Sequence, residues 1–323
     1  MFRPSLWTLL AAAADISLVL ASPCVSFDSN FNLLVFGTSN KDYSAGKLSN
    51  WSNGNAVTDI TSSNGRPPFN GANTTCYLAQ YFNAIYFLNA DDSQPDVVHI
   101  YNADNRAWST NQITVPDGFD STSVNAILDH DTNVFYGLSE GKLYFMRMDE
   151  LVTATSTPVF WERTTDPNFD VSHYSPVMGL AKNHIHFIDV DQTPGLARIF
   201  VIHYAYWQPE IQPYAAANNK GTFPQTYGHI FSVPNNENVD QKEFAFFPQD
   251  SRATYVINVD RNTTQVLAAP PAKDAKALYA ASPSSLVQLG SAGDLSFLPY
   301  NTNNVAGNTQ ATWKKIGSIP AWS

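Results

Sequence analysis

The sequence predicts an all-β fold, a six-bladed β-propeller made of four-stranded antiparallel blades. Short strands with alternating apolar residues, separated by turns rich in Asn, Asp, Gly, Ser and Pro, recur with a period of about 50 residues. No stretch sustains the 3.6-residue period of an amphipathic helix. Six such units, counted from a first strand near Cys24, fill the chain after its amino-terminal segment, so we expect one domain over 23–323.

The strands of each unit follow from this pattern. First strands are predicted near Cys24 and at 76–82, 124–129, 175–180, 229–233 and 278–282. Second strands are predicted at 33–36, 84–88, 133–136, 184–188, 243–247 and 286–289. Third strands are predicted at 47–51, 97–101, 142–146, 198–203, 254–259 and 294–298. A fourth strand carries a tryptophan in four units, at Trp108, Trp161, Trp207 and Trp313, and the fifth unit lacks one.

Composition and charge limit the possible partners. Charged residues make up only 14% of the chain, against roughly a quarter in an average protein, so the surface must be largely uncharged and polar. The formal net charge is −10 and no basic cluster occurs, which argues against nucleic acid and anionic membranes as partners.

Residues 1–22 have the pattern of a secretory signal peptide, with Arg3 before an apolar stretch and small residues at 19–21 for cleavage. A membrane anchor is the alternative, but the apolar run is too short and too interrupted to span a bilayer about 30 Å thick. No later segment could cross a bilayer. We therefore expect a secreted, extracellular protein.

Two further features fit the secretory pathway. Sequons at Asn50, Asn73 and Asn262 predict N-glycosylation. Cys24 and Cys76 begin first strands in consecutive units, and a disulfide between them would tie blade 1 to blade 2. The alternative is a pair of buried free thiols.

The fourth-strand tryptophans are the first candidates for function. In many propellers such a residue packs one blade against the next. At the mouth of an inter-blade cleft, however, an indole face could stack on the apolar face of a sugar ring. Arg106 precedes Trp108, while Glu162 and Arg163 follow Trp161. These polar side chains could form hydrogen bonds with the sugar hydroxyls.

A histidine set in the fourth unit is the second candidate. His184 and His186 lie on one face of a strand, and a hairpin turn at 194–195 would place His203 opposite His186. Three imidazoles on one face could bind zinc. The set occurs in one unit only, so we expect no metal or other cofactor.

Aspartates could also support acid–base catalysis. Asp129, His130 and Asp131 share one turn, and Asp189 and Asp191 follow the second strand of the fourth unit. Aspartates in tight turns usually cap the backbone, and none of the linear signatures of sialidases, zinc proteases or α/β-hydrolases occurs.

With these features the chain resembles the fungal fucose-specific lectins. It shares with them the unit length and number, Gly-Lys-Leu at 46–48 and 141–143 with the variant Gly-Asp-Leu at 293–295, and a tryptophan-rich end at 311–322. That family grips fucose with an arginine in the second strand and a glutamate in the third. Here aliphatic residues stand at the arginine position, and Asn50 or Phe145, two residues after Gly-Lys-Leu, stands at the glutamate position. The resemblance to these lectins implies the propeller architecture and leaves the ligand open. Residues 98–108 resemble the repeat of kelch-type propellers to a comparable degree.

These observations together predict a secreted, lectin-like binding protein without enzymatic activity, whose partner is a glycan or glycoprotein. One alternative is a propeller hydrolase or lactonase with a site at the channel mouth, using His184, His186 and His203 as ligands. A further alternative is a scaffold for protein interactions.

Overall fold

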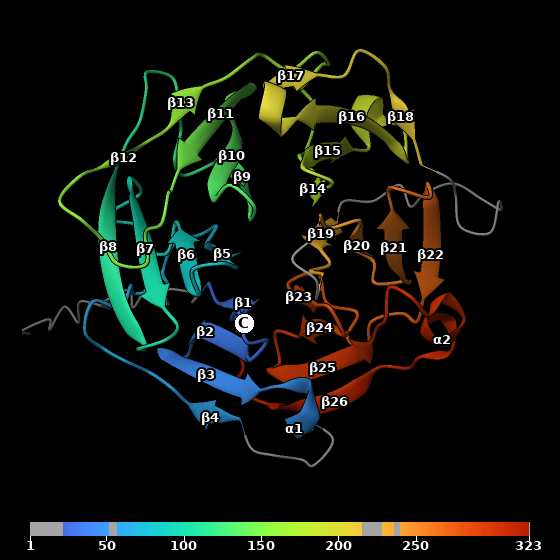
Figure 1. Ribbon diagram of the computed structural model, residues 1–323. Coiled ribbons are helices and arrows are strands. Elements are labelled where there is room, and N and C mark those ends of the chain that lie inside the picture. Colours follow the sequence, from blue (N-terminus) through green and yellow to red (C-terminus); the bar gives the residue numbers. More distant parts are fainter. Residues whose placement is uncertain (1–21, 52–56, 215–227, 236–239, 323) are drawn as a thin grey trace, which may run out of the picture.

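The computed structural model describes residues 22–51, 57–214, 228–235 and 240–322. Six small sheets stand around a central axis, as Figure 1 shows, and each contributes its first strand to the inner wall. The predicted six-bladed β-propeller is confirmed. The predicted leader over 1–22 lies outside the described residues except for Ser22.

The first three blades occupy the amino-terminal half of the ring (Figure 1). Blade 1 comprises β1 (Cys24–Phe27), β2 (Leu33–Thr38), β3 (Lys41–Gly46) and β4 (Thr58–Asp59), with the short helix α1 (Leu48–Trp51). Blade 2 comprises β5 (Thr75–Ala79), β6 (Ala84–Leu88), β7 (Val97–Asn102) and β8 (Ala107–Thr114), joined in parallel by β12 (Val159–Phe160). Blade 3 comprises β9 (Asn125–Asp129), β10 (Val134–Ser139), β11 (Lys142–Arg147) and β13 (Glu162–Arg163).

The remaining blades complete the ring. Blade 4 comprises β14 (Met178–Ala181), β15 (His184–Ile188) and β16 (Leu196–Val201), and its outer position is shared by β17 (Tyr206–Trp207) and β18 (Gln212–Pro213). Blade 5 comprises β19 (Gly228–Ser232), β20 (Glu243–Pro248), β21 (Thr254–Asn258) and β22 (Thr263–Leu267). Blade 6 comprises β23 (Leu278–Ser282), β24 (Ser285–Leu289), β25 (Asp294–Pro299) and β26 (Lys314–Ser318), with helix α2 (Val305–Gln310) before β26. Two 3-10 turns, η1 (Val190–Gln192) and η2 (Ile202–Tyr204), flank β16.

One predicted strand is wrong. Residues 47–51, expected as the third strand of blade 1, instead enter helix α1, and β3 precedes them. Gly46 adopts a φ of +67° at the end of β3, a conformation that favours glycine and stops the strand. The Gly-Lys-Leu at 46–48 therefore does not open a strand, whereas the one at 141–143 leads into β11.

Helix α1 has a packing role at the closure of the ring. Trp51 is buried and its ring lies 4.9 Å from that of Phe297 in blade 6. Its indole nitrogen donates to the Ala45 carbonyl at 2.9 Å. Blades 1 and 6 share no strand, so this apolar contact between the two ends of the chain closes the propeller.

Tryptophans occupy five of the six blade junctions. Each packs in an apolar cluster shared by neighbouring blades: Trp51 between blades 6 and 1, Trp108 between 1 and 2, Trp161 between 2 and 3, Trp207 between 3 and 4, and Trp313 between 5 and 6. The junction between blades 4 and 5 has no tryptophan among the described residues. Phe244, Phe246 and Tyr214 fill it instead.

The predicted disulfide is present. Cys24 in β1 and Cys76 in β5 are bonded, with their Cα atoms 6.2 Å apart. Because β1 and β5 are neighbouring inner strands, the bond fastens blade 1 to blade 2. Within the described part of the chain, no helix has the length and apolar character needed to span a membrane.

Candidate functional site between blades 4 and 5

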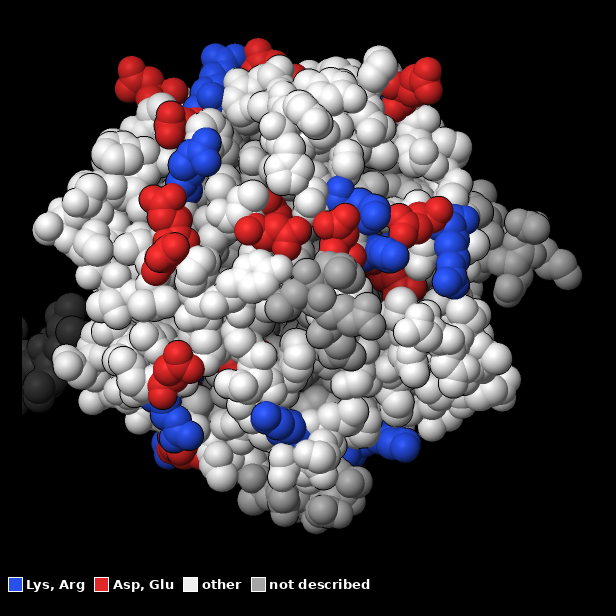
Figure 2. Space-filling model, in the orientation of Figure 1, with Lys and Arg blue, Asp and Glu red and all other residues white. Residues whose placement is uncertain are grey.

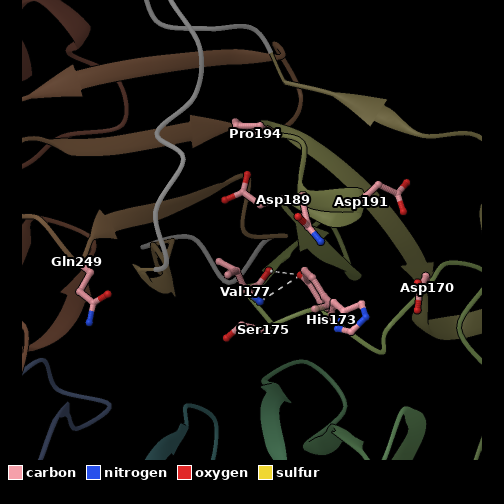
Figure 3. Close-up of a pocket in the computed structure, with 10 residues that line it drawn as sticks. Asp170, His173, Ser175, Val177, Asp189, Asp191, Pro194 and Gln249 are labelled. Atoms are coloured by element: carbon pink, nitrogen blue, oxygen red, sulfur yellow. Dashed lines mark hydrogen bonds between the residues drawn. The ribbon is translucent and has the colours of Figure 1, made fainter.

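A cavity of about 710 Å³ opens beside the junction that lacks a tryptophan. Blade 4 and the segment leading into it supply nearly all of its wall, and the β20–β21 turn of blade 5 supplies the rest. Figure 3 shows Gln249 of blade 5 on the opposite side of the cavity from Asp170 and His173. The lining residues are Asp170, His173, Tyr174, Ser175, Val177, Asp189, Asp191, Gln192, Pro194 and Gln249.

The turn between β15 and β16 forms one wall of this cavity. Asp189, Asp191 and Gln192 all have φ between 53° and 59°, in the left-handed region. Aspartate tolerates this region in tight turns, so these φ values mark a compact loop. Val190, fully buried between them, anchors the turn and leaves its polar neighbours at the cavity.

Two carboxyl groups of the cavity have opposite pKa shifts. Burial raises the pKa of Asp189 to about 6, although the Gly195 backbone N–H donates to its Oδ1 at 2.9 Å. Hydrogen bonds from the side chain and backbone of Ser172 lower the pKa of the exposed Asp170. Near pH 6 the cavity therefore holds one carboxyl that is partly protonated and one that is ionised.

Tyr174 supplies an aromatic ring held in a fixed position. Its hydroxyl donates to the Ile188 carbonyl at 2.7 Å and accepts from the Val177 N–H at 3.1 Å. The ring stands edge-on to Phe169, which in turn packs against Trp207. A ring held from both ends loses little conformational entropy when a ligand contacts it.

The cavity is acidic. Three aspartates line it, and the described residues of the lining include no lysine or arginine. On the face of the ring shown in Figure 2, most of the surface is uncharged and the charged side chains stand in small groups. The large polar, uncharged surface follows from the low charged fraction of the sequence.

Most of the tryptophans that the sequence suggests as ligand contacts are not exposed to solvent. Trp108, Trp161 and Trp207 are buried, with exposed fractions of 8%, 3% and 8%. We expect at least one solvent-facing indole among the four tryptophans, and these three do not provide it because each packs between blades. Trp313 is half-buried, and its nitrogen donates to the Ala268 carbonyl at 3.0 Å. It alone of the four keeps part of its surface open.

The polar neighbours of these tryptophans have different environments. Arg106 is exposed and lines a second cavity, of about 280 Å³, between blades 1 and 2. Asp28, Asn83 and Asp104 also line that cavity. Glu162 and Arg163 are exposed on β13, and Arg163 pairs with Asp166 at 2.6 Å. Neither residue lines a cavity described here.

The predicted convergence of three histidines is wrong. His186 pairs in register with Ile199, and the exposed His203 lies beyond β16 in η2. The register differs because the loop between β15 and β16 contains the 3-10 turn at 190–192 in addition to the turn at 194–195. The buried His186 bonds to Tyr214 through Nδ1, whereas His184 approaches the Lys182 carbonyl. Among the described residues no group of three metal-binding side chains converges.

The turn at 129–131 forms a polar cluster elsewhere. His130 Nε2 lies 3.0 Å from Asp131 Oδ1, which also accepts from the Tyr81 hydroxyl at 3.2 Å. Asp131 lines a third cavity, of about 550 Å³, together with Asp149 and Glu150. The Thr132 hydroxyl bonds to Asp129 at 2.5 Å, which is the turn-capping role expected of such an aspartate.

The three sequon asparagines are all exposed. Asn73 and Asn262 donate weakly to backbone carbonyls, each at 3.2 Å. Asn50 lies in α1 and accepts from the Lys47 N–H at 3.2 Å. Their positions are compatible with glycosylation, which stays a prediction.

Sequence patterns alone did not reveal most of this site. The sequence marks Asp189 and Asp191 as candidates for acid–base catalysis or as turn-capping residues, while Tyr174, Ser175 and Gln249 belong to no functional motif. The missing tryptophan in the fifth unit was the available signal, because it marks the junction where the cavity opens.

Comparison with known proteins identifies no family and no ligand for the chain. No protein-family model matches the chain, and no curated protein is similar to it. Among the matching solved structures is a chain from a crystal structure of a nidogen/laminin complex, with a TM-score of 0.42 and 10% identity. The match covers 75% of this chain and 77% of the other. Similarity at this level supports no inference about activity or partner.

Proposed function

We propose that this protein is a secreted, non-enzymatic carbohydrate-binding protein whose ligand occupies the cavity between blades 4 and 5. The observation that carries the proposal is the lining of that cavity. Carboxylate, amide, hydroxyl and imidazole groups surround the fixed ring of Tyr174. Sugar recognition uses such a combination, because hydroxyls need several polar partners and the sugar ring needs an apolar face to contact.

The size and preformed shape of the cavity also support this function. Its volume lies in the usual range for small-molecule sites, about 300 to 1,000 Å³. Hydrogen bonds within blade 4 hold both Asp189 and Tyr174 in place without a ligand. A site organised before binding spends little of its interaction energy on ordering side chains.

Secretion is proposed on separate grounds. The Cys24–Cys76 disulfide is of a kind that persists mainly in oxidising compartments. Exposed sequon asparagines and the signal-like residues 1–22 agree with that environment. The cavity between blades 1 and 2, with Arg106, is a possible second site for the same class of ligand.

A glycan array tests the proposed function. The wild-type protein should bind a defined set of glycans, and Ser175→Trp, which fills the exposed side of the cavity, should abolish that binding. Gln112→Trp is the matched control, since Gln112 is exposed on β8 and away from the cavity. Absence of any bound glycan, or equal binding by both variants, would contradict the proposal.

A hydrolase is the second candidate because Asp189 and Asp170 have opposite pKa shifts in one cavity. A general acid and an ionised carboxylate are the two groups that glycoside hydrolysis needs. Prolonged incubation with any glycan bound on the array distinguishes the two functions. Release of a shorter sugar by the wild type but not by Asp189→Asn would establish catalysis.

A further inference from the structure

We propose that the ligand of the cavity between blades 4 and 5 is a sugar that carries a free, protonated amine, and that Asp189 binds this amine. This inference rests on the proposed function and narrows it to one class of carbohydrate. Its basis is the charge of the described lining, the position of Asp189 within it and the absence of a lysine or arginine among the described lining residues.

The charge of the cavity selects against acidic sugars. Asp170, Asp189 and Asp191 contribute carboxylates to the lining, and no lysine or arginine is among the lining residues that the structure describes. The whole chain adds a net charge of −10. A carboxylated or sulfated sugar would enter against this field, whereas an ammonium group would be attracted into it.

Asp189 is the carboxylate best placed to bind the amine. It lies beside the anchored turn at Val190, and the Gly195 N–H holds its Oδ1, so its orientation is fixed. Asp170 is exposed and already accepts two hydrogen bonds from Ser172, and Asp191 is also exposed. A partly buried carboxylate gains more from an ammonium partner than an exposed one, because solvent screens the pair less.

Binding of an amine should couple to protonation of Asp189. Burial raises the pKa of Asp189 to about 6 in the free protein, and an adjacent ammonium would lower it again. Near pH 6 the complex should therefore release protons from Asp189. Other titratable groups around it are Tyr174 and His173 in the lining.

The remaining charges near Asp189 do not alter this expectation. On the adjoining blade 5 hairpin, Arg252 and Asp250 pair with each other at 2.5 Å. Gln249, the blade 5 residue that lines the cavity, is uncharged. No cationic group of the described lining competes with the amine for Asp189.

Calorimetry with a matched pair of ligands tests the inference. The probes are a β-linked glucosamine oligomer and its fully N-acetylated counterpart. The first carries protonatable amines, and the second carries uncharged acetamido groups at the same positions. At about pH 7 the free amine should bind about tenfold more tightly or better, the usual value of a charge-assisted hydrogen bond. Asp189→Asn should remove this preference, and Asp250→Asn, outside the lining, should retain it.

The outcomes separate this inference from the proposed function. Equal affinity for both oligomers, or tighter binding of the acetylated one, would overturn the amine hypothesis while leaving carbohydrate binding intact. The amine hypothesis is supported if the affinity for the free amine falls between about pH 7 and about pH 5. Calorimetry in buffers of different ionisation enthalpy should also show that binding releases protons. A requirement for added Ca²⁺ would overturn it, because the carboxylates would then hold a metal. If neither oligomer nor any glycan on the array binds, the proposed function itself fails.

Discussion

His186 and Tyr214 are hydrogen-bonded partners inside the junction between blades 4 and 5. The His186 Nδ1 meets the phenol oxygen, and both rings pack against Phe244. Both residues are buried, at 4% and 8% exposure. A polar pair thus helps to fill the junction at which the described residues include no tryptophan, and the candidate site opens beside it.

This pair makes stability depend on pH. Burial lowers the pKa of His186 to about 4, from 6.5 in the unfolded chain. Between those values the unfolded state binds a proton that the folded state does not, so stability falls as the pH drops through the window. The slope is about 1.4 kcal/mol per pH unit for one such histidine. Melting temperatures measured from pH 7 down to about pH 4 should show this loss of stability.

Comparing variants of two histidines with the wild type isolates the contribution of His186 to this pH dependence. His99, with its pKa also lowered to about 4 by burial, adds to the same slope, and Asp189, with a raised pKa, opposes it. His186→Gln should reduce the slope of stability against pH by the contribution of one histidine. His203→Gln, at an exposed position, should leave that slope unchanged. Identical slopes for all three proteins would refute the role given to His186.

The buried tryptophans should carry much of the packing energy. Trp108 contacts the rings of Phe36, Phe69, Phe87 and Tyr101 between blades 1 and 2. Trp108→Ala should destabilise the protein by about 3 to 5 kcal/mol. Trp313→Ala should cost less, because half-buried Trp313 leaves a smaller cavity. Guanidinium unfolding measures both, and equal losses would show that burial does not decide the effect.

The disulfide should contribute substantially to stability. The loop between Cys24 and Cys76 spans 52 residues, and closing one of that size is worth about 4 kcal/mol in the chain-entropy model. Replacing both cysteines by serine should lower the unfolding midpoint accordingly. Thiol titration of the denatured, unreduced wild type should find no free sulfhydryl. Two titratable thiols would show that the bond does not form in the mature protein.

The exposed sequons should be glycosylated when a eukaryotic host secretes the protein. Asn50, Asn73 and Asn262 all lie at the surface, where the transferase can reach them before or after folding. Endoglycosidase treatment should lower the mass of the wild type. Each Asn→Gln substitution should reduce that change by one glycan. A mass equal to that of the bare chain would rule out modification in that host.

The repeat could be predicted because the alternation of apolar and polar residues along each strand is visible in the sequence. The predicted strands at 84–88, 184–188 and 278–282 coincide with β6, β15 and β23, since apolar residues face the blade junctions there. The disulfide followed from matching positions in neighbouring units. Turn geometry could not be predicted in the same way. The left-handed Asp189, Asp191 and Gln192 shift the β15–β16 register and separate His203 from His186.

The candidate site was only partly visible in the sequence. Tryptophans at corresponding positions of the repeat suggest repeated ligand sites, but burial between blades explains the recurrence of Trp108, Trp161 and Trp207. The cavity instead forms where the fifth unit lacks its tryptophan. Its lining comes from segments separated along the chain, Asp170 to Val177, the turn after β15 and Gln249. Only the ring brings these segments together.

Hydrogen exchange with a bound glycan tests the central claim most directly. Backbone amides at 170–177 and 189–195, which include the Val177 and Gly195 N–H groups bonded to the site residues, should become more protected when the ligand binds. Amides around Arg106 and Trp313 should change less. Protection confined to Trp313 or to the cavity at Arg106, with none in blade 4, would contradict the placement of the binding site between blades 4 and 5.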